Sequence, residues 1–298
     1  MKRFVSLALA ATLLAACADS SPSPATDANP SSAEIWWTAI PDKDKDALQQ
    51  KFDPVSAYLT EKVGITFKYK PVAKYDAAVT QFANGDVMLA WFGGLSGVQA
   101  RDEVPGSRAI AQGAADPKFK SYFIAHKSTG LEKSDAFPMG IADLPFAFGS
   151  KGSTSGRLMP EFFLREATKK SPDDFFKMPF VFSGAHDKTA RWVAEGNKVK
   201  VGALNYITYD NMVAAGDIDP ETCRIIWVTP EYADYNISAH PDLDKIHGAG
   251  TIDKIQKALI EMKDPKLLAA FERKQLIEAK NEEFDGILEV AKQLKLVR

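Results

Sequence analysis

The sequence predicts an α/β protein built from two lobes, and three observations support this fold class. Segments with strand character alternate with helical patterns at a spacing typical of parallel strand–helix units. The globular part, 33–298, has roughly 265 residues, which is more than one core usually holds. A second block of strands and helices lies in the middle of the chain, and the helices after it need a partner. We therefore expect mixed sheets flanked by helices, with two hinge crossings between the lobes.

The N-terminus predicts a signal peptide over residues 1–16. Lys2 and Arg3 precede an apolar run that is shorter than the ~20 residues of a membrane-spanning helix. The run ends in LAAC, at Cys17, a pattern that resembles the lipobox of bacterial lipoproteins. The resemblance implies cleavage before Cys17, lipidation of that residue and a membrane-anchored protein outside the cytoplasm, in the periplasm. The alternative is an ordinary signal peptide in which the cysteine has no role.

The segment 17–32 predicts a tether between the anchor and the folded protein. It is rich in Ser, Pro, Ala and Asp and has no aromatic or large aliphatic side chain after the cysteine, so it cannot bury enough apolar surface to fold. We expect a lipidated N-terminus and disordered linker over 17–32, lobe I over 33–119 and 232–298, and an inserted lobe II over 120–231. Two lobes joined by two crossings form a cleft, a common place for a small ligand.

The first lobe begins with a strand expected at 34–40, where EIWWTAI ends at Pro41. Apolar residues at helical spacing predict a helix over 45–62, although Pro54 lies inside it. The next elements are a strand at 65–72, a helix at 75–82, a turn at 84–86 and a buried strand at 87–92. This succession predicts parallel strands.

The second block contains its own strands and helices. We expect strands at 122–126, 142–148, 180–183, 199–204 and 224–228, a helix at 158–169 and a helix that ends near 193. The crossings between lobes are expected near Tyr122 and Trp227. The C-terminal segment 251–296 has an amphipathic helical pattern.

Composition excludes several classes of function. The formal net charge of -2 over 298 residues, without a basic stripe, argues against nucleic-acid binding. Beyond Cys17 the chain has one cysteine, Cys223, which we expect to be a small buried hydrophobe. The four histidines, His126, His186, His240 and His247, share no ligand spacing with nearby carboxylates, so we expect no metal and no cofactor.

The stretch AFGSKGSTSG places three hydroxyls, Ser153, Thr154 and Ser155, between a strand and a helix. Unpaired backbone N–H groups at a helix N-terminus favour an anion, and hydroxyls beside them add donors. The alternative is simple N-capping, for which one hydroxyl is enough. The glycine spacing matches neither GxGxxG nor GxxxxGK[ST], so nucleotide binding is excluded.

A nucleophile is the other alternative at this stretch. GSTSG resembles the GxSxG elbow of hydrolases only superficially, because its central residue is Thr154. A hydroxyl of the stretch could pair with His186, but the neighbouring Asp187 is poorly placed to orient an imidazole that must also face a hydroxyl. Anion capture without chemistry is the interpretation that uses every residue.

Four segments resemble the PhnD-type substrate-binding proteins of ABC importers, a family that binds phosphonates, phosphite and related oxyanions. They are NGDVMLAWFGGLSGVQAR (84–101), GSTSGRLMP (152–160), FSGAHD (182–187) and RIIWVTPEYADYN (224–236). The resemblance covers essentially all of 33–298. It implies a type II periplasmic binding protein whose two lobes close on a ligand, with an ABC permease and ATPase as partners and no enzymatic activity.

The resemblance also implies site residues. Ser153, Thr154 and Ser155 are expected to bind the oxyanion from lobe II. The other positions that match the family's cleft are Tyr75, Tyr122, His186, Asp234, Trp91 and Phe92, with Trp91 and Phe92 on a loop that faces the cleft.

One position departs from the family. Receptors for aminophosphonates carry an acid where this chain has Ile207, with Asn205 and Asp210 nearby, which argues against a ligand with an amine. We expect Asn205 to contribute to the ligand site. The ligand is expected to be phosphonate, phosphite, phosphate or a mimic such as selenate, captured by a monomer. The alternatives are a lipid-anchored hydrolase using a cluster hydroxyl with His186, and a sensing domain for a membrane kinase.

Overall fold

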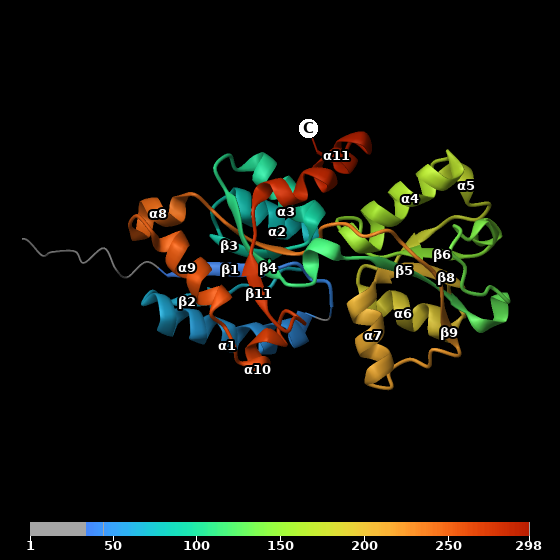
Figure 1. Ribbon diagram of the computed structural model, residues 1–298, viewed down its shortest axis with the longest axis horizontal. Helices are drawn as coiled ribbons and strands as arrows, with labels where there is room; N and C mark the ends of the chain where they lie inside the picture. Colours follow the sequence, from blue (N-terminus) through green and yellow to red (C-terminus); the bar gives the residue numbers. More distant parts are fainter. Residues whose placement is uncertain (1–33, 44, 298) are drawn as a thin grey trace, which may run out of the picture. The chain divides into compact units, whose positions relative to one another are not determined.

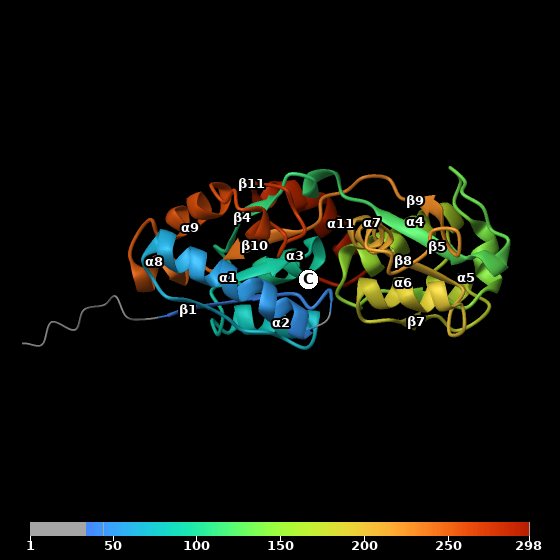
Figure 2. The ribbon, with the colours of Figure 1, turned by 90° about the horizontal axis from the view of Figure 1, so that it is seen from below.

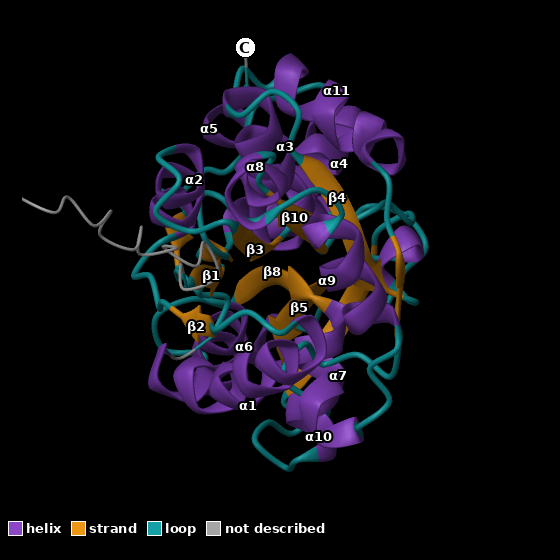
Figure 3. Ribbon diagram, turned by 90° about the vertical axis from the view of Figure 1, so that its left-hand side faces the viewer, coloured by secondary structure: helices purple, strands orange, loops and turns teal. Residues whose placement is uncertain are grey.

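The computed structural model describes residues 34–43 and 45–297 and arranges its strands in two mixed sheets (Figure 1). The first sheet has the strand order β11-β4-β10-β3-β1-β2, and the second has the order β7-β6-β8-β5-β9. Helices cover both sheets, so that the strands lie inside (Figure 3). The α/β class with mixed sheets flanked by helices is thereby confirmed. The signal peptide, Cys17 and the linker lie outside the described residues.

The strands and helices have the following bounds. The strands are β1 Ile35–Ala39, β2 Phe67–Tyr69, β3 Leu89–Phe92, β4 Arg108–Gly113, β5 Ser121–His126, β6 Phe146–Phe148, β7 Val181–Phe182, β8 Val201–Asn205, β9 Cys223–Val228, β10 Asn236–Ala239 and β11 Leu276–Glu278. The α-helices are α1 Lys45–Val63, α2 Tyr75–Ala83, α3 Gly94–Glu103, α4 Met159–Thr168, α5 Pro172–Phe175, α6 His186–Glu195, α7 Tyr206–Ala214, α8 Asp242–His247, α9 Thr251–Ile260, α10 Pro265–Leu268 and α11 Asp285–Gln293.

The first sheet combines parallel and antiparallel pairs. Strand β1 pairs in parallel with β2 and β3, as the strand–helix alternation predicts. Strand β10 then inserts antiparallel between β3 and β4. The core of this sheet is aromatic: Trp37 packs edge-on against Phe52 and Tyr69, with ring centroids 5.1 and 5.3 Å away. Such pairs contribute stability beyond their buried area.

The second sheet is also mixed. Strand β6 pairs in parallel with β7 and β8, whereas β5 is antiparallel to both β8 and β9. Helix α6 packs on β8 and β5 (Figure 2), and on its buried side Ala190 and Val193 belong to the core. Cys223 is fully buried in the same core, and burial raises the pKa of its thiol to about 12. These observations match the expected role of a small hydrophobe.

The chain passes between the sheets twice, from β4 to β5 and from β9 to β10. The two connections meet at an antiparallel bridge between Phe119 and Tyr232. The sequence placed the second crossing near Trp227, but that residue lies inside β9 and packs on Phe123 of the second sheet. The crossing follows the strand, because the paired residues extend to Val228. The lobe boundaries at 119/120 and 231/232 stay a prediction.

A buried ion pair supports the crossings. The Arg273 guanidinium donates to the carboxylate of Asp116, and both side chains are almost fully buried. The same guanidinium lies 5.4 Å from the ring of Phe119 and 4.8 Å from that of Tyr235. An arginine that pairs with a carboxylate and stacks on aromatic rings is held in one geometry.

Several elements differ from the expectation. Helix α3 follows β3 where we expected a loop, and β11 interrupts a segment with a helical pattern. Strands β4 and β10 and helices α5, α7 and α8 were not expected from the sequence. In the described part of the chain, no helix combines the length and the apolar character that a membrane span requires.

Candidate functional site

The hydroxyl-rich stretch forms a turn that opens a helix. A π-helical turn, Thr154–Leu158, leads directly into α4, and Ser153 caps it by accepting the Gly156 N–H at 3.0 Å. Gly149 and Gly156 let the strand end and the turn approach closely, since a Cβ on Gly149 would lie 3.0 Å from the Gly156 Cα. The three hydroxyl side chains are buried. A widened helical turn of this kind frequently marks a functional site.

His186 begins α6 and faces Ser153. Its Nε2 lies 3.4 Å from the Ser153 Oγ, and its Nδ1 accepts the backbone N–H of Asn205 at 3.2 Å. Because Nδ1 is an acceptor, the neutral ring carries its proton on Nε2. Burial, with a smaller contribution from the cation of Lys43, lowers the pKa of His186 to about 3. His186 is therefore an uncharged donor aimed at the hydroxyl stretch.

Asp234 and Thr154 meet the N-terminus of α3. The Asp234 Oδ1 accepts the Gly94 N–H at 2.8 Å, and the Thr154 Oγ1 accepts the Leu95 N–H at 2.9 Å. The Asp234 Oδ2 is buried and has no hydrogen-bond partner among the described residues. Burial raises the pKa of Asp234 to about 7, although the hydrogen bond from Gly94 and the nearby Thr154 and Ser155 hydroxyls oppose this rise. This carboxyl can carry or accept a proton near neutral pH.

Tyr75 is the first residue of α2 and supplies a second unpaired group. Its phenol oxygen is buried and lacks a hydrogen-bond partner within the described residues. Burial, and then the charge of Asp42, raises the pKa of this phenol well above its ordinary value, so it stays a donor. The nearby Ser153 hydroxyl opposes this rise in the pKa of Tyr75. A buried donor without a partner is costly unless a ligand or water completes it.

These residues form a group that we call the polar cluster: Tyr75, Ser153, Thr154, Ser155, His186 and Asp234. Helices begin on all sides of it, namely α2 at Tyr75, α3 at Gly94, the π-helical turn at Thr154 and α6 at His186. Each N-terminus carries a partial positive charge, although the Gly94 and Leu95 N–H groups of α3 already donate to Asp234 and Thr154. The cluster can therefore stabilise a small anion without a lysine or arginine.

Asn205 supports the cluster from behind. Its side chain caps α7 by accepting the Thr208 N–H at 2.6 Å and donates to the Tyr235 Oη at 3.1 Å. Tyr235 in turn donates to the Asp42 Oδ2 at 3.0 Å. Because both ends of the Asn205 amide are engaged, its contribution to the cluster is to hold His186 through its backbone. Asp42 and Tyr235 could not be predicted from the sequence, because they take part only through contacts distant in sequence.

Trp91 and Phe92 lie in strand β3 rather than on a loop, so that part of the expectation is wrong. Phe92 is fully buried and packs edge-on against Phe82 at 5.5 Å. Trp91 stacks on Tyr235 at 5.3 Å and lines a hollow of about 10 Å³ next to Asn205. Strand pairing on both sides of β3 fixes these rings in the core.

The structure does not bring Tyr122 to the polar cluster. Its ring packs against Tyr206 and Tyr209 with centroids 6.1 and 5.6 Å away. Burial, and then the charge of Asp210, raises the pKa of its phenol to about 12. A direct role of Tyr122 in ligand binding stays a prediction.

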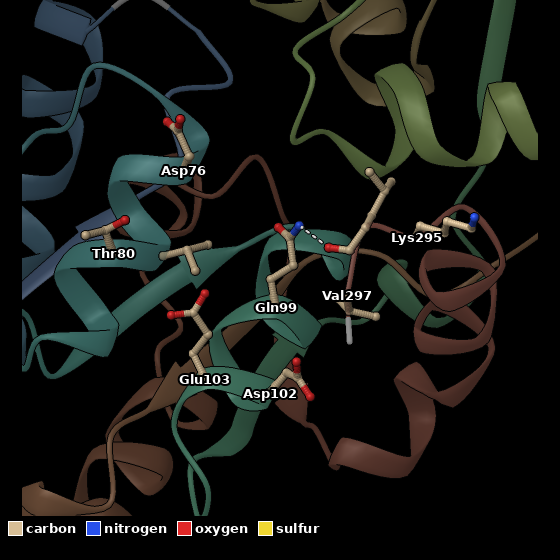
Figure 4. Close-up of a pocket in the computed structure, with 9 residues that line it drawn as sticks. Asp76, Thr80, Gln99, Asp102, Glu103, Lys295 and Val297 are labelled. Atoms are coloured by element: carbon tan, nitrogen blue, oxygen red, sulfur yellow. Dashed lines mark hydrogen bonds between the residues drawn. The ribbon is translucent and has the colours of Figure 1, made fainter.

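A hollow of about 680 Å³ lies between α2, α3 and the C-terminal residues (Figure 4). The Gln99 side chain donates to the backbone carbonyl of Leu296 at 3.0 Å across it. Three carboxylates, on Asp76, Asp102 and Glu103, line this hollow, and none of the polar cluster does. An anion would be repelled there, so volume does not identify the candidate site.

No group of three metal-ligating side chains occurs within residues 34–43 and 45–297. The polar cluster offers mainly hydrogen-bond donors, which a cation does not favour.

Residues 37–284 match the family described as "ABC transporter, phosphonate, periplasmic substrate-binding protein". The probable ABC transporter phosphite-binding protein PhnD1 of Prochlorococcus marinus is 36% identical over 267 residues, which cover 87% of this chain and 89% of that protein. The phosphate-import protein PhnD of Mycolicibacterium smegmatis is 27% identical and covers 84% of this chain and 78% of its own.

The solved structures include one with the same degree of identity. PhnD1 from Prochlorococcus marinus, in complex with methylphosphonate, superposes with a TM-score of 0.82 and 36% identity, covering 90% of this chain and 99% of that one. The tungstate-binding protein TupA of Desulfovibrio alaskensis, at 13% identity and a TM-score of 0.52, shares the fold alone.

Proposed function

Because the chain belongs to the family of periplasmic substrate-binding proteins of phosphonate ABC transporters, we propose that its polar cluster captures a small tetrahedral phosphorus oxyanion for import. Phosphite, methylphosphonate and phosphate are ligands named for its relatives. The fold is that of the type II periplasmic binding proteins. A permease and an ATPase of the transporter are the partners that this function requires.

One observation carries the assignment of the ligand site. The buried Tyr75 Oη and Asp234 Oδ2 both lack a hydrogen-bond partner in the described part of the chain. They stand at a point on which the N-termini of several helices converge. A bound oxyanion accepts from the three hydroxyls, Ser153, Thr154 and Ser155, and from Tyr75 and His186. It shares a proton with Asp234. Such a ligand completes groups that would otherwise be costly to bury.

The chemistry of Asp234 narrows the ligand. A monoprotonated phosphonate or phosphite can donate to the ionised carboxylate, whereas selenate has no proton to give near neutral pH. Ile207 lines a different hollow, with Asp210 and Arg273. Asp42 is close enough to affect the pKa of Tyr75, but its carboxylate already accepts a hydrogen bond from Tyr235. A poorly paired buried ammonium is costly. We therefore propose an oxyanion that carries phosphorus and no amine.

The hydrolase alternative requires His186 to take a proton from Ser153. Its Nδ1 accepts the Asn205 N–H, so the ring nitrogen facing Ser153 already carries a proton. A pKa of about 3 also makes the ring a weak base at neutral pH. These features support binding without chemistry. A sensing domain for a membrane kinase would use the same binding event and remains the second candidate.

Localisation follows from the sequence pattern at the N-terminus. We propose that residues 1–16 are removed, that Cys17 is lipidated and that 17–32 tether a monomeric binding protein to a membrane. We also propose that lobe I (33–119 and 232–298) and lobe II (120–231) close on the ligand about their two crossings.

A thermal-shift screen of phosphite, methylphosphonate, phosphate, aminoethylphosphonate and selenate tests the function. A ligand at 100 times its dissociation constant adds ~2.7 kcal/mol of stability, which raises the melting temperature by several degrees. We expect phosphite or methylphosphonate to give the largest shift. No shift with any phosphorus oxyanion, or turnover of phosphoester or acyl substrates, contradicts the proposal.

A further inference from the structure

The polar cluster is sealed from solvent. Ser153, Thr154 and Asp234 each expose 2% of their surface or less. An anion can therefore reach the cluster only when some contact around it opens. The position of this contact follows from the hollows that adjoin the cluster.

A hollow of about 580 Å³ lies directly outside the cluster. Its lining includes Lys74, Tyr75, Ser150, Lys151, Gly152 and Gly184. Tyr75 belongs to both the hollow and the cluster, and Gly152 immediately precedes Ser153. Lys74 and Lys151 are exposed and attract anions into the hollow, with Asp76 as an opposing charge.

A second hollow offers a contrast. It measures about 560 Å³ and is lined by Ile207, Asp210, Arg273 and Lys274, among others, but by no residue of the polar cluster. The hollow next to Trp91 is lined by Asn205 and Tyr235, which lie behind the cluster, yet its volume of about 10 Å³ holds no more than one water. Of the three hollows, the one lined by Gly152 is therefore the route by which an anion can approach the cluster.

Gly152 and Tyr75 close this side by direct contact. A Cβ on Gly152 would lie 2.7 Å from the Tyr75 Cβ and 3.4 Å from its Cγ. The backbone of α2 fixes the Tyr75 Cβ, so no rotation of the side chain relieves the clash. Only separation of α2 from the turn at Ser150–Ser153 would make room.

We infer that the contact between Gly152 and Tyr75 is the gate through which the oxyanion reaches and leaves the polar cluster, and this inference rests on the proposed function. Glycine is needed because any side chain prevents the gate from shutting. The backbone of Gly152 is outside the left-handed region, so alanine is compatible with the turn itself.

The test compares Gly152→Ala with wild type, using the full chain purified in detergent. Stopped-flow tryptophan fluorescence with phosphite and methylphosphonate reports the rates of ligand association and dissociation. Trp91 is the reporter, because it lines the same small hollow as Asn205 and Tyr235. We expect dissociation about ten- to a hundred-fold faster and affinity weaker by the same factor, as for an overpacked contact. Gly286→Ala is the matched control, because a Cβ there meets nothing within 4 Å. Thermal unfolding without ligand should be unchanged within a few degrees in both variants.

Charge reversal tests the side of access independently. Lys151→Glu should slow association about three- to ten-fold at low salt, with a smaller effect at high salt and little change in dissociation. Lys274→Glu, in the second hollow, should leave association unchanged.

The outcomes separate the two claims. If the wild-type protein binds neither phosphite nor methylphosphonate, both the proposed function and the gate are wrong. If wild type binds and Gly152→Ala keeps the wild-type affinity and dissociation rate, the gate is wrong while the function stands. Equal slowing by Lys274→Glu and Lys151→Glu would also overturn the assigned side.

Discussion

The pH dependence of selenate binding tests the role of Asp234 most sharply. Selenate brings no proton, so it can approach the Asp234 Oδ2 only when that carboxyl is protonated and donates. With a pKa of about 7, the protonated fraction of Asp234 falls from about nine-tenths at pH 6 to about one-tenth at pH 8. We expect the affinity for selenate to fall about ten-fold over this interval, because binding above pH 7 requires uptake of one proton.

A phosphorus oxyanion behaves differently because it titrates itself. When its second proton dissociates near neutral pH, the complex needs one proton in total, on the ligand or on Asp234. The affinity for phosphite should therefore pass through a maximum near pH 7 and fall by only a few-fold at pH 6 and pH 8. Calorimetric titrations at pH 6, 7 and 8 distinguish this profile from the continuous decline expected for selenate.

Asp234→Asn replaces the titratable carboxyl with an amide of nearly the same shape. The amide oxygen can still accept the Gly94 N–H, and its NH₂ group replaces the protonated Oδ2 as a permanent donor. Selenate affinity should become independent of pH, and the advantage of phosphite at pH 8 should narrow. Asp210→Asn is the matched control, because burial also raises the pKa of Asp210 but its carboxyl lies beside Tyr122. A decline with pH that survives in Asp234→Asn refutes this reasoning.

Three further predictions concern other parts of the molecule. Tyr75→Phe should weaken phosphite binding about ten- to a hundred-fold. It should leave thermal stability without ligand unchanged or higher, because the phenol has no hydrogen-bond partner among the described residues. Equal losses of stability and affinity would contradict this prediction. Cys17→Ser should release the chain into the soluble fraction or block its processing, as cell fractionation will show, and a processed variant that stays on the membrane argues against lipidation. Saturating methylphosphonate should reduce the radius of gyration measured by small-angle scattering, and an identical scattering curve argues against lobes that close.

Local signals predicted the parts of the fold that local chemistry decides. The strands around Trp37 and Phe123 and the turn at Ser153 follow from alternation, apolar runs and glycines. Helix α3 was missed because GLSGVQARDE is rich in glycine and weakly helical by propensity. Contacts with β10, α2 and α11 hold this helix in place, and none of them is visible in the sequence.

The site could be predicted only where one segment contains its own signal. The three hydroxyls and His186 lie in such segments, and the structure brings them together. Strand β11 was hidden because its residues Leu276–Glu278 pair with β4, more than 160 residues earlier. Asp42 and Tyr235 were missed for the same reason, since their hydrogen bond spans 193 residues. Tyr122 was predicted from its match to the family, but its ring packs against two other tyrosines and not at the polar cluster.

The central claim is that the buried hydroxyls at the π-helical turn bind the oxyanion, and calorimetry of two cluster variants tests it directly. Thr154→Ala and Ser155→Ala each remove a donor to a charged acceptor, worth ~1.5–3 kcal/mol when buried. Each should weaken phosphite and methylphosphonate binding about ten- to a hundred-fold at one ligand per chain.

Ser171→Ala is the control, because Ser171 caps α5 by accepting the Asp174 N–H and lies outside the polar cluster. It should cost about 1 kcal/mol of stability and no affinity. If the two cluster variants bind phosphite and methylphosphonate as tightly as wild type, the oxyanion binds elsewhere and the account is contradicted.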